Sequence, residues 1–417
     1  MALTFAAIFW GIVTFSLLVV LHEGGHMLTA RAFGVKVHEF FIGLPGPNIS
    51  FKKGETRYGV TCIPLGGYVR IAGMEGDVND PLLEPVLAYL TIKRAADLKE
   101  LACQFNKKPE EISSLMVVLE DWDAVSYNKQ TKTWTSAYSK ELAENPSNLF
   151  KKAQERTFLA LSAGKRIAVL CAGVAVNIVC ALAVFTIVLT GWGYYKDLGH
   201  IDVVKGGPAS QAGLRKDDKI TAVDTHKVTT FEDIPIVLKS NYKVGETVTL
   251  SVTRDAHSFE KQVTLAKNPK SASPYLGITN VMTHVKPSIK ESMRQSFGYV
   301  GLTFKALGGF FNPSTFKESA SQSSSIVGIS VMAAKAAETS ALDYAWLIAA
   351  ISLSLGIMNI LPLPPLDGGK VLFEIIGAIR RKPISMKVQT GVSLAGFGLL
   401  FALVIFLTYN DFTHLLG

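Results

Sequence analysis

His22, Glu23 and His26 form an HExxH pattern at the end of an apolar stretch. On a helix, residues i and i+4 share one face, so both imidazoles can reach one metal ion at ~2 Å. Glu23 lies between them, where a carboxylate can take a proton from water at the metal. Ionisable groups at membrane depth are costly and usually functional. The pattern indicates a zinc hydrolase; the alternative is two snorkelling histidines and a solvated glutamate at a helix end.

A catalytic zinc usually has three protein ligands, and the best candidate for the third is distant in sequence. Asp367 is the sole carboxylate of the segment Asn359–Gly369, which follows another apolar stretch and contains three prolines. These prolines break the helix, and irregular backbone at membrane depth must face protein or a water-filled cavity. We expect Asp367 to join the two histidines; otherwise it caps the helix that follows.

Composition places this chemistry in a membrane protein with soluble insertions. The 417 residues are 48% hydrophobic and 18% charged, and the net charge is +8. Lys and Arg are scattered and form no long basic run, so nucleic acid is not an expected partner. The four cysteines have no CxxC spacing, which gives no support to a disulfide framework or a cysteine zinc site.

Four apolar stretches approach the ~20 residues that cross a bilayer. They are Leu3–Leu21, Ile167–Thr190, Tyr344–Leu361 and Val388–Thr408. Lys and Arg cluster after the first, before the second, and between the third and fourth. The positive-inside rule then predicts both termini outside the cytoplasm and the first and third connections inside it. This orientation brings His22, His26 and Asp367 to the same, cytoplasmic side.

With these motifs established, the chain resembles the site-2 protease family, in particular the bacterial intramembrane zinc metalloproteases of the RseP type. The stretches that carry the resemblance are His22–His26, Pro64–Arg70, Ala172–Asn177 and Asn359–Gly368, together with a PDZ-like segment. The order of these motifs and the predicted topology agree along most of the chain. Residues 76–160 and about 297–340 are poorly covered by the resemblance.

The resemblance implies a site and a reaction. His22, His26 and Asp367 would bind one catalytic Zn²⁺, and Glu23 would be the general base. Asn359 would support the reacting carbonyl or the substrate backbone. Asn177 matches a family asparagine and would contact the substrate, although Val174 stands where a proline is usual. Each asparagine could instead form an interhelical hydrogen bond.

Two segments are candidates for holding substrate. Residues Val37–Ala72 read as β-rich, and an edge there, near Gly66 and Gly67, could pair with an unwound substrate; a purely structural hairpin is the alternative. Leu276, Gly277 and Ile278 resemble the carboxylate-binding loop of a circularly permuted PDZ domain. That domain either binds or sterically filters substrate ectodomains, or is a folded spacer.

The predicted fold class is an α-helical membrane protein with four transmembrane helices, a membrane-associated β-hairpin region and one α+β PDZ-like extracytoplasmic domain. The expected segments are 3–36 (first helix with HExxH), 37–75 (β region), 76–164 (cytoplasmic insert), 165–192 (second helix), 196–281 (PDZ-like domain), 282–342 (extracytoplasmic linker and amphipathic region), 343–380 (third helix and Asp motif) and 387–409 (fourth helix).

The resemblance implies a multi-pass protease of the bacterial inner or plasma membrane, with its active site toward the cytoplasm. Its partners would be single-pass membrane-protein substrates, cut within their transmembrane segments. Release of anti-sigma factors and clearance of signal-peptide remnants are the kinds of process implied. Two other functions fit the sequence less well: a non-catalytic scaffold has no use for Glu23, and an ion transporter would have few spans with four.

Overall fold

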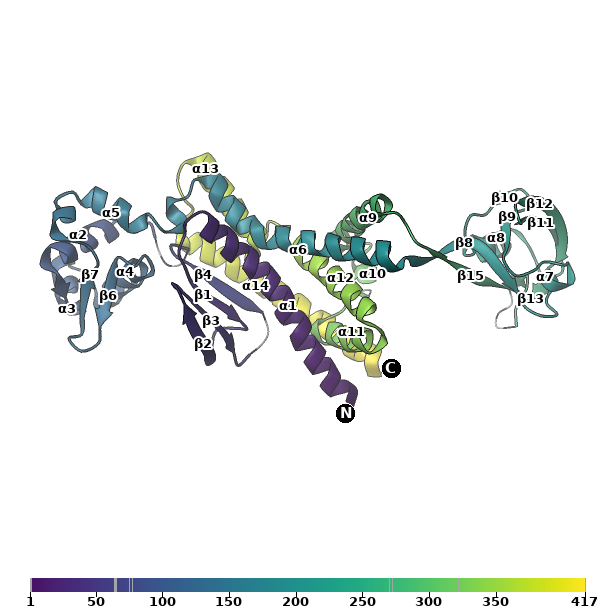
Figure 1. The fold of residues 1–417 in the computed structure, drawn as a ribbon, viewed down its shortest axis with the longest axis horizontal. Helices are drawn as coiled ribbons and strands as arrows, with labels where there is room; N and C mark the ends of the chain where they lie inside the picture. The colour runs from purple at the N-terminus through teal and green to yellow at the C-terminus, as the bar shows by residue number, and fades with distance from the viewer. Residues whose placement is uncertain are drawn as a thin grey trace. The chain divides into compact units, whose positions relative to one another are not determined.

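The computed structural model describes residues 2–63, 66–74, 76, 78–269, 271, 273–321 and 323–416. These residues form two compact units, one made of residues 1–185 with 295–417 and the other of residues 186–294. Helices α6 (Ala163–Trp192) and α9 (Ile289–Gly308) run from one unit into the other, and the two units are described separately (Figure 1).

Four helices of the structure are long and apolar enough to cross a membrane, as predicted. They are α1 (Ala2–Ala32), α6 (Ala163–Trp192), α12 (Ala341–Ile360) and α14 (Met386–Leu416). Only 6% of the apolar window in α14 is buried within the protein. A helix with so much exposed apolar surface is stable only if that surface faces lipid.

Helices α6 and α12 pack through small and aromatic side chains. Gly356 of α12 lies against the backbone of α6, and the Ser352 hydroxyl donates to the Asn177 carbonyl at 3.0 Å. A buried cluster continues this contact along both helices. Close approach at small residues, with hydrogen bonds across the contact, is how helices associate where the hydrophobic effect is weak.

One further helix, shorter than a membrane span, lies beside α1. Helix α11 (Ile326–Thr339) begins at a Ser325 cap, whose hydroxyl accepts from the amides of Val327 and Gly328. It packs along α1, where Ser330 lies against Gly11. The preceding elements are α9 (Ile289–Gly308), η3 (Gly309–Phe311) and α10 (Phe316–Ser321).

A four-stranded sheet follows α1. Its strands are β1 (Val37–Ile42), β2 (Asn48–Lys53), β3 (Thr56–Thr61) and β4 (Gly67–Ile71), in the order β2-β3-β1-β4. The β2–β3 hairpin turns where the sequence predicts, whereas β1 pairs parallel with β3 and antiparallel with β4. Strand β4 is therefore an edge strand, and it packs against α1.

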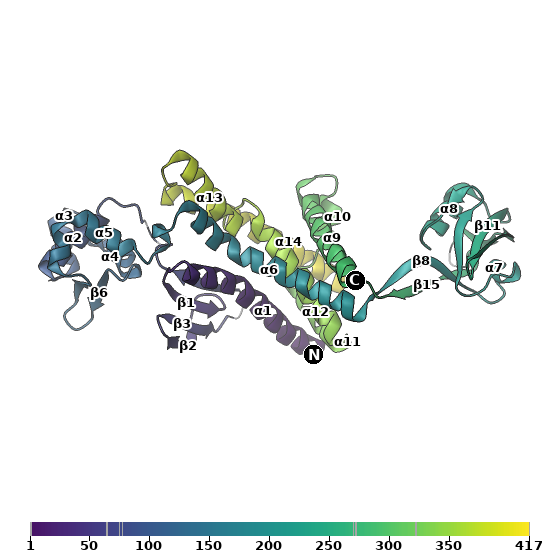
Figure 2. The same ribbon diagram turned by 45° about the horizontal axis from the view of Figure 1, so that its top comes forward.

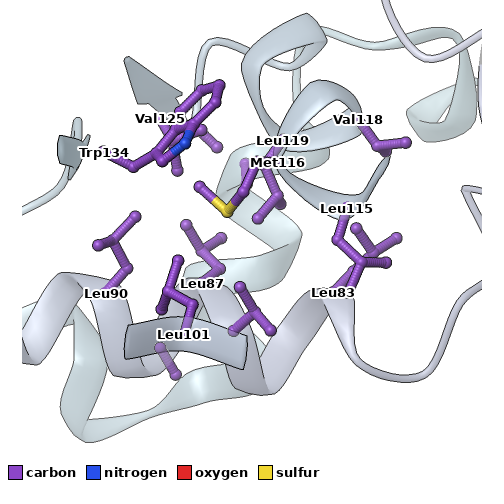
Figure 3. Packing of buried hydrophobic residues seen from close by; sticks show 14 of the residues in the cluster. Leu83, Leu87, Leu90, Leu101, Leu115, Met116, Val118, Leu119, Val125 and Trp134 are labelled. Carbon is purple, nitrogen blue, oxygen red and sulfur yellow. The ribbon is translucent and has the colours of Figure 1, made fainter. Parts of the chain in front are cut away.

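The insert after β4 has its own hydrophobic core (Figure 3). Its elements are α2 (Leu83–Lys93), β5 (Ala95–Ala96), α3 (Leu98–Phe105), α4 (Pro109–Asp121), β6 (Val125–Asn128), β7 (Thr133–Ser136), η1 (Lys140–Glu144), α5 (Pro146–Gln154) and η2 (Phe158–Ala160). Residues 83–105 form two helices rather than one. Arg94 has a φ of 80°, which ends α2 before the short strand β5.

The second unit contains a six-stranded sheet, in which β10 pairs with β9 beside the main path of five strands, and two short helices. It contains β8 (Tyr194–Val203), α7 (Pro208–Gln211), β9 (Asp218–Val223), β10 (His226–Lys227), α8 (Asp233–Asn241), β11 (Thr247–Arg254), β12 (His257–Thr264), β13 (Ala266–Lys267), β14 (Pro274–Tyr275) and β15 (Ile278–Val285). The path runs β12-β11-β9-β8-β15, so β15 lies at one edge. Figures 1 and 2 show β8 and β15 as a long antiparallel pair.

Candidate metal centre and active site

Helix α1 continues through the HExxH pattern without interruption, so His22 and His26 lie one turn apart on the same face. Asp367 begins α13 (Asp367–Arg380). Asp367 Oδ2 lies 2.9 Å from His22 Nε2 and 3.2 Å from His26 Nε2, and the two Nε2 atoms are 3.3 Å apart. All three residues are buried, with at most 9% of their surface exposed. Residues separated by more than 340 positions thus form one cluster.

This donor set fits a zinc ion. A tetrahedral ion with ligand bonds of ~2.0–2.1 Å holds neighbouring donor atoms ~3.3 Å apart, close to the three separations in the cluster. Two imidazole nitrogens and one carboxylate oxygen are also a common ligand set of hydrolytic zinc sites, which keep a fourth position open. Among the described residues, His22, His26 and Asp367 are the one group of three His, Cys, Asp or Glu side chains whose ligand atoms all lie within 4.8 Å of one another.

Each histidine has a hydrogen-bond partner at its other ring nitrogen. His26 Nδ1 lies 2.7 Å from the Val169 carbonyl of α6, to which it can only donate. That bond places the proton on Nδ1 and leaves the Nε2 lone pair free to bind a metal. Such outer partners fix the tautomer and the ring orientation of metal-binding histidines.

Asn177 is the corresponding partner of His22. It is fully buried, its Nδ2 lies 3.2 Å from His22 Nδ1, and its Oδ1 has no partner among the described residues. Amide oxygen and nitrogen are assigned from their hydrogen bonds, so the amide turns over when His22 Nδ1 carries the proton. Oδ1 then accepts from Nδ1–H, and His22 Nε2 is free for the metal. The sequence associated Asn177 with substrate, but this contact is to a histidine.

We expect Asn177→Leu, which keeps the volume but removes the acceptor, to weaken zinc binding about 10- to 100-fold. Chelator competition on the purified protein measures this. Asn359→Leu serves as the matched control, because its side chain contacts no member of the His22, His26 and Asp367 cluster in the described contacts and should leave zinc affinity unchanged. Equal zinc affinity in wild type and Asn177→Leu would show that this hydrogen bond does not orient His22.

Two glycines allow α1 and α6 to cross at the metal site. A Cβ at Gly25 would lie 2.6 Å from the Ala172 carbonyl oxygen, and one at Gly173 would overlap His26 Nε2 and lie 2.8 Å from the His22 carbonyl oxygen. Gly24, beside Gly25, has open space where a Cβ would go. The close approach of the two helices therefore explains why glycine occupies positions 25 and 173.

The segment before α13 directs Asp367 toward the histidines. The N-cap of α13 is Leu366, with no side-chain capping bond, so capping is not the role of Asp367 here. A Cβ at Gly369 would lie 2.6 Å or less from Pro364, so the chain folds back tightly at this point. Lys370, one turn further, has its Nζ 3.6 Å from Asp367 Oδ1. The sequence analysis did not identify Lys370, although residues three positions apart on a helix are neighbours, so its spacing from Asp367 indicates a possible ion pair.

A cavity of about 210 Å³ adjoins the cluster. It is lined by residues of α1, β4, α6 and α13, and by Met74: Glu23, His26, Gly67, Tyr68, Val69, Ile71, Met74, Val169, Leu170, Asp367 and Lys370. Glu23 therefore shares one space with two of the metal-site residues and with strand β4. A Cβ at Gly67 would lie 2.7 Å from the Phe41 carbonyl oxygen and would overlap Val19 of α1. Glycine at this position lets β4 approach α1 beside Glu23.

The other predicted site residues lie elsewhere. Asn359, on the last turn of α12, donates its amide to the Leu355 carbonyl at 3.0 Å and does not line this cavity. Gly66 has a φ of 83° and its carbonyl accepts from the Gly43 amide. Pro64 and Leu65, which begin the matching stretch Pro64–Arg70, lie outside the described residues.

In the second unit, the loop Leu276–Ile278 connects β14 and β15. The Leu276 side chain is 1% exposed, within the unit's own core. The carbonyls of Leu276 and Gly277 accept from the amides of Ala209 and Val204. The Leu276 side chain therefore belongs to the core of the unit, and the loop is fixed by two backbone hydrogen bonds.

Comparisons with known proteins identify the family of this chain. The model of peptidase family M50 matches residues 10–403. A putative zinc metalloprotease of Streptococcus pyogenes serotype M6 is 30% identical over 96% of this chain and 97% of its own length. The zinc metalloprotease RasP of Geobacillus kaustophilus is 30% identical over 96% of each chain, and the probable protease eep of Enterococcus faecalis is 28% identical over 96% and 97%.

Among solved structures, the PDZ domain of an SdrC-like protein from Listeria monocytogenes matches with 26% identity. The match covers 21% of this chain and 90% of that one, at a TM-score of 0.19. The family match spans the HExxH helix, the sheet, the second unit and the Asp367 segment. The chain belongs to peptidase family M50, the site-2 protease family, and is a membrane-embedded protease of the zinc metalloprotease type.

Proposed function

We propose that this protein is an intramembrane zinc metalloendopeptidase that hydrolyses peptide bonds within the transmembrane segments of single-pass membrane proteins. The observation that carries the proposal is the meeting of His22, His26 and Asp367 beside a cavity that also holds Glu23. The three side chains come from α1 and α13, and α1 is itself a candidate membrane span. We propose that they bind one Zn²⁺.

The roles of the chain's own residues follow from this arrangement. A zinc ion bound there would supply Lewis-acid activation of water and of the scissile carbonyl. Glu23 accepts the proton of the attacking water and returns it to the leaving amine. The Val169 carbonyl and Asn177 hold the two imidazoles in the required tautomer. For Asn359 we propose contact with the substrate, which requires its amide to leave the Leu355 carbonyl.

Strand β4 is our candidate for holding the substrate in an extended form. A transmembrane helix satisfies its own backbone hydrogen bonds, so it must unwind before a peptide bond can be attacked. In the described part of the chain, β4 pairs only with β1, and its residues Gly67, Tyr68 and Val69 line the cavity beside Glu23. An unwound substrate segment can pair with this edge by β-augmentation.

We propose the sidedness that the basic flanks indicate, with both termini outside the cytoplasm and the metal site toward it. In this orientation the second unit is extracytoplasmic. There it would bind or sterically filter substrate ectodomains, and strand β15 at the edge of its sheet offers a place for an added peptide strand. We propose that the protease acts in processes such as the release of anti-sigma factors or the clearance of signal-peptide remnants.

The test is cleavage of a purified single-pass substrate reconstituted with the protein in lipid vesicles. Mass spectrometry should place the cut inside the transmembrane segment. A zinc chelator should abolish the cut and added zinc should restore it. Cleavage confined to the ectodomain, or cleavage that survives full removal of zinc, would contradict the proposal.

A further inference from the structure

The insert between β4 and α6 has the topology of a winged helix. After α2 and the short strand β5, helices α3 and α4 are joined by a turn at residues 106–108, and the β6–β7 hairpin follows. The three strands form one sheet in the order β5-β7-β6. A helix-turn-helix followed by a β-hairpin wing is an architecture that presents its second helix, here α4, to a macromolecular partner.

The packing supports this architecture. The turn depends on Asn106, which has a φ of 49° and caps α3 in the left-handed conformation. One face of α4 packs into the core of the insert against α2, α3 and Trp134 (Figure 3). The buried residues of α4 are Ile112, Leu115, Met116, Val118, Leu119 and Asp121.

The opposite face of α4 is exposed and carries negative charge. Glu110, Ser114, Val117 and Glu120 recur at spacings of three and four residues, which place them on one side of the helix. Val117 has 58% of its surface exposed between these carboxylates. Glu111 is also exposed and pairs with Lys107 at 3.2 Å. The surface is therefore an apolar side chain flanked by acidic groups, and α4 contains no Lys or Arg.

This charge is opposite to what nucleic acid requires. The phosphate backbone dominates nucleic-acid affinity and is neutralised by Lys and Arg. The phosphates that line a groove of DNA or RNA would repel an α4 face that bears Glu110 and Glu120. The insert (residues 76–164) has 13 Asp and Glu against 11 Lys and Arg, although the whole chain has a net charge of +8. A basic peptide segment is the complementary partner.

The C-terminal end of α4 is joined to the sheet that lines the catalytic cavity. Asp121, its last residue, accepts from the Gly73 amide at 2.7 Å through Oδ2 and from His38 Nε2 at 2.7 Å through its carbonyl. Asp123 pairs with Lys36, just before β1. These contacts attach α4 to the ends of β1 and β4, and β4 lines the cavity.

We propose that the α4 surface, made of Glu110, Ser114, Val117 and Glu120, binds the basic cytoplasmic segment that flanks the transmembrane helix of a substrate. The positive-inside rule supplies Lys and Arg to such segments, so the charge is complementary. This inference rests on the proposed function for the identity of its occupant. The winged helix would then select substrates by their cytoplasmic flank and hold that flank near the catalytic cavity.

The test uses the full-length protein with Glu23→Gln, in lipid nanodiscs, so that binding is read without cleavage. The probe is a fluorescent 15-residue peptide with five Lys or Arg and interspersed Leu, and fluorescence anisotropy measures its binding. We expect Glu110→Lys with Glu120→Lys to weaken binding at least tenfold, and added salt to weaken binding to the parent protein. Glu144→Lys with Glu155→Lys is the matched control, since both residues are exposed acids of the same insert. It should leave binding unchanged.

Three results would overturn the inference. One is equal binding of the basic peptide to both double variants. Another is tighter binding of a 30-base-pair DNA duplex than of the peptide, which would make the insert a nucleic-acid module. The third is self-association of the protein that the α4 reversal abolishes, which would make a second copy the occupant. These results differ from a failure of the proposed function. That failure would appear as absence of cleavage by the protein with Glu23 intact, whatever the peptide binding.

Discussion

Replacing Glu23 with Gln should lower the rate of intramembrane cleavage by about 10²- to 10⁴-fold, the usual contribution of a general base. Gln has nearly the same shape as Glu but cannot accept the proton of the attacking water. Because Glu23 is not one of the three clustered donor residues, zinc content should stay at the wild-type level. Cleavage of a reconstituted single-pass substrate and metal analysis of the same sample measure both quantities.

Glu338→Gln is the control, since Glu338 is an exposed residue of α11 and plays no part in the site. It should cleave at the wild-type rate. If Glu23→Gln retained most of the activity while binding zinc, Glu23 would not be the base. If it lost zinc as well, its carboxylate would have to belong to the metal site.

Gly173→Ala should eliminate both high-affinity zinc binding and cleavage, although it adds a single methyl group. The new Cβ would overlap His26 Nε2, so the imidazole or the whole of α6 must move. Displacing the metal ligand His26 should weaken zinc binding more than removing a hydrogen-bond partner of a ligand, as in Asn177→Leu. We therefore expect zinc affinity to fall by about 100-fold or more. Overpacking of the α1–α6 contact should also destabilise the bundle by about 1–3 kcal/mol.

The chain provides matched controls for this prediction. Gly164→Ala lies on the same helix, where a Cβ meets nothing within 4 Å, and Ala favours a helix over Gly by about 1 kcal/mol. It should keep full zinc binding. Gly25→Ala should behave like Gly173→Ala, whereas Gly24→Ala should bind zinc normally. Normal zinc binding by Gly173→Ala would mean that α1 and α6 do not approach closely at the site.

The parts of this protein that could be predicted from the sequence are those with local signals. Four apolar stretches specify four helices of spanning length, and the i, i+4 spacing of His22 and His26 specifies a shared helix face. Asp367 could be associated with them because the basic flanks placed all three residues on one side of the membrane. A common position along the membrane normal follows from the basic flanks alone and requires no knowledge of how the helices pack.

Features that depend on tertiary contact could not be predicted. Nothing local to Asn177 indicates that its amide meets His22 Nδ1, because that contact depends on how α6 crosses α1. The parallel pairing of β1 with β3 could not be predicted either, because it depends on how the strands assemble into the sheet and not on any local sequence signal. The hydrogen bond from the Asn359 amide to the Leu355 carbonyl also has no signal in the sequence, and a role of Asn359 at the reacting carbonyl or the substrate backbone stays a prediction.

The insert shows a different limit of sequence reasoning. The break at Arg94 could not be predicted from the sequence. That residue's positive φ separates α2 from α3 and makes room for β5. Without β5 the three-stranded sheet is incomplete, and the winged-helix topology cannot be recognised. Helix α11 was too short to be assigned as a span, and its position beside α1 became evident only from packing.

The zinc content of the purified protein, compared between wild type, Asp367→Ala and Asp343→Ala, tests the metal centre most directly. Asp343 is an exposed carboxylate in the first turn of α12, so its removal controls for the loss of a negative charge. We predict one zinc per chain in wild type and in Asp343→Ala, and almost none in Asp367→Ala after dialysis against a mild chelator. A full complement of zinc in Asp367→Ala would contradict the account, because a metal held without Asp367 could not be the one that α1 and α13 together define.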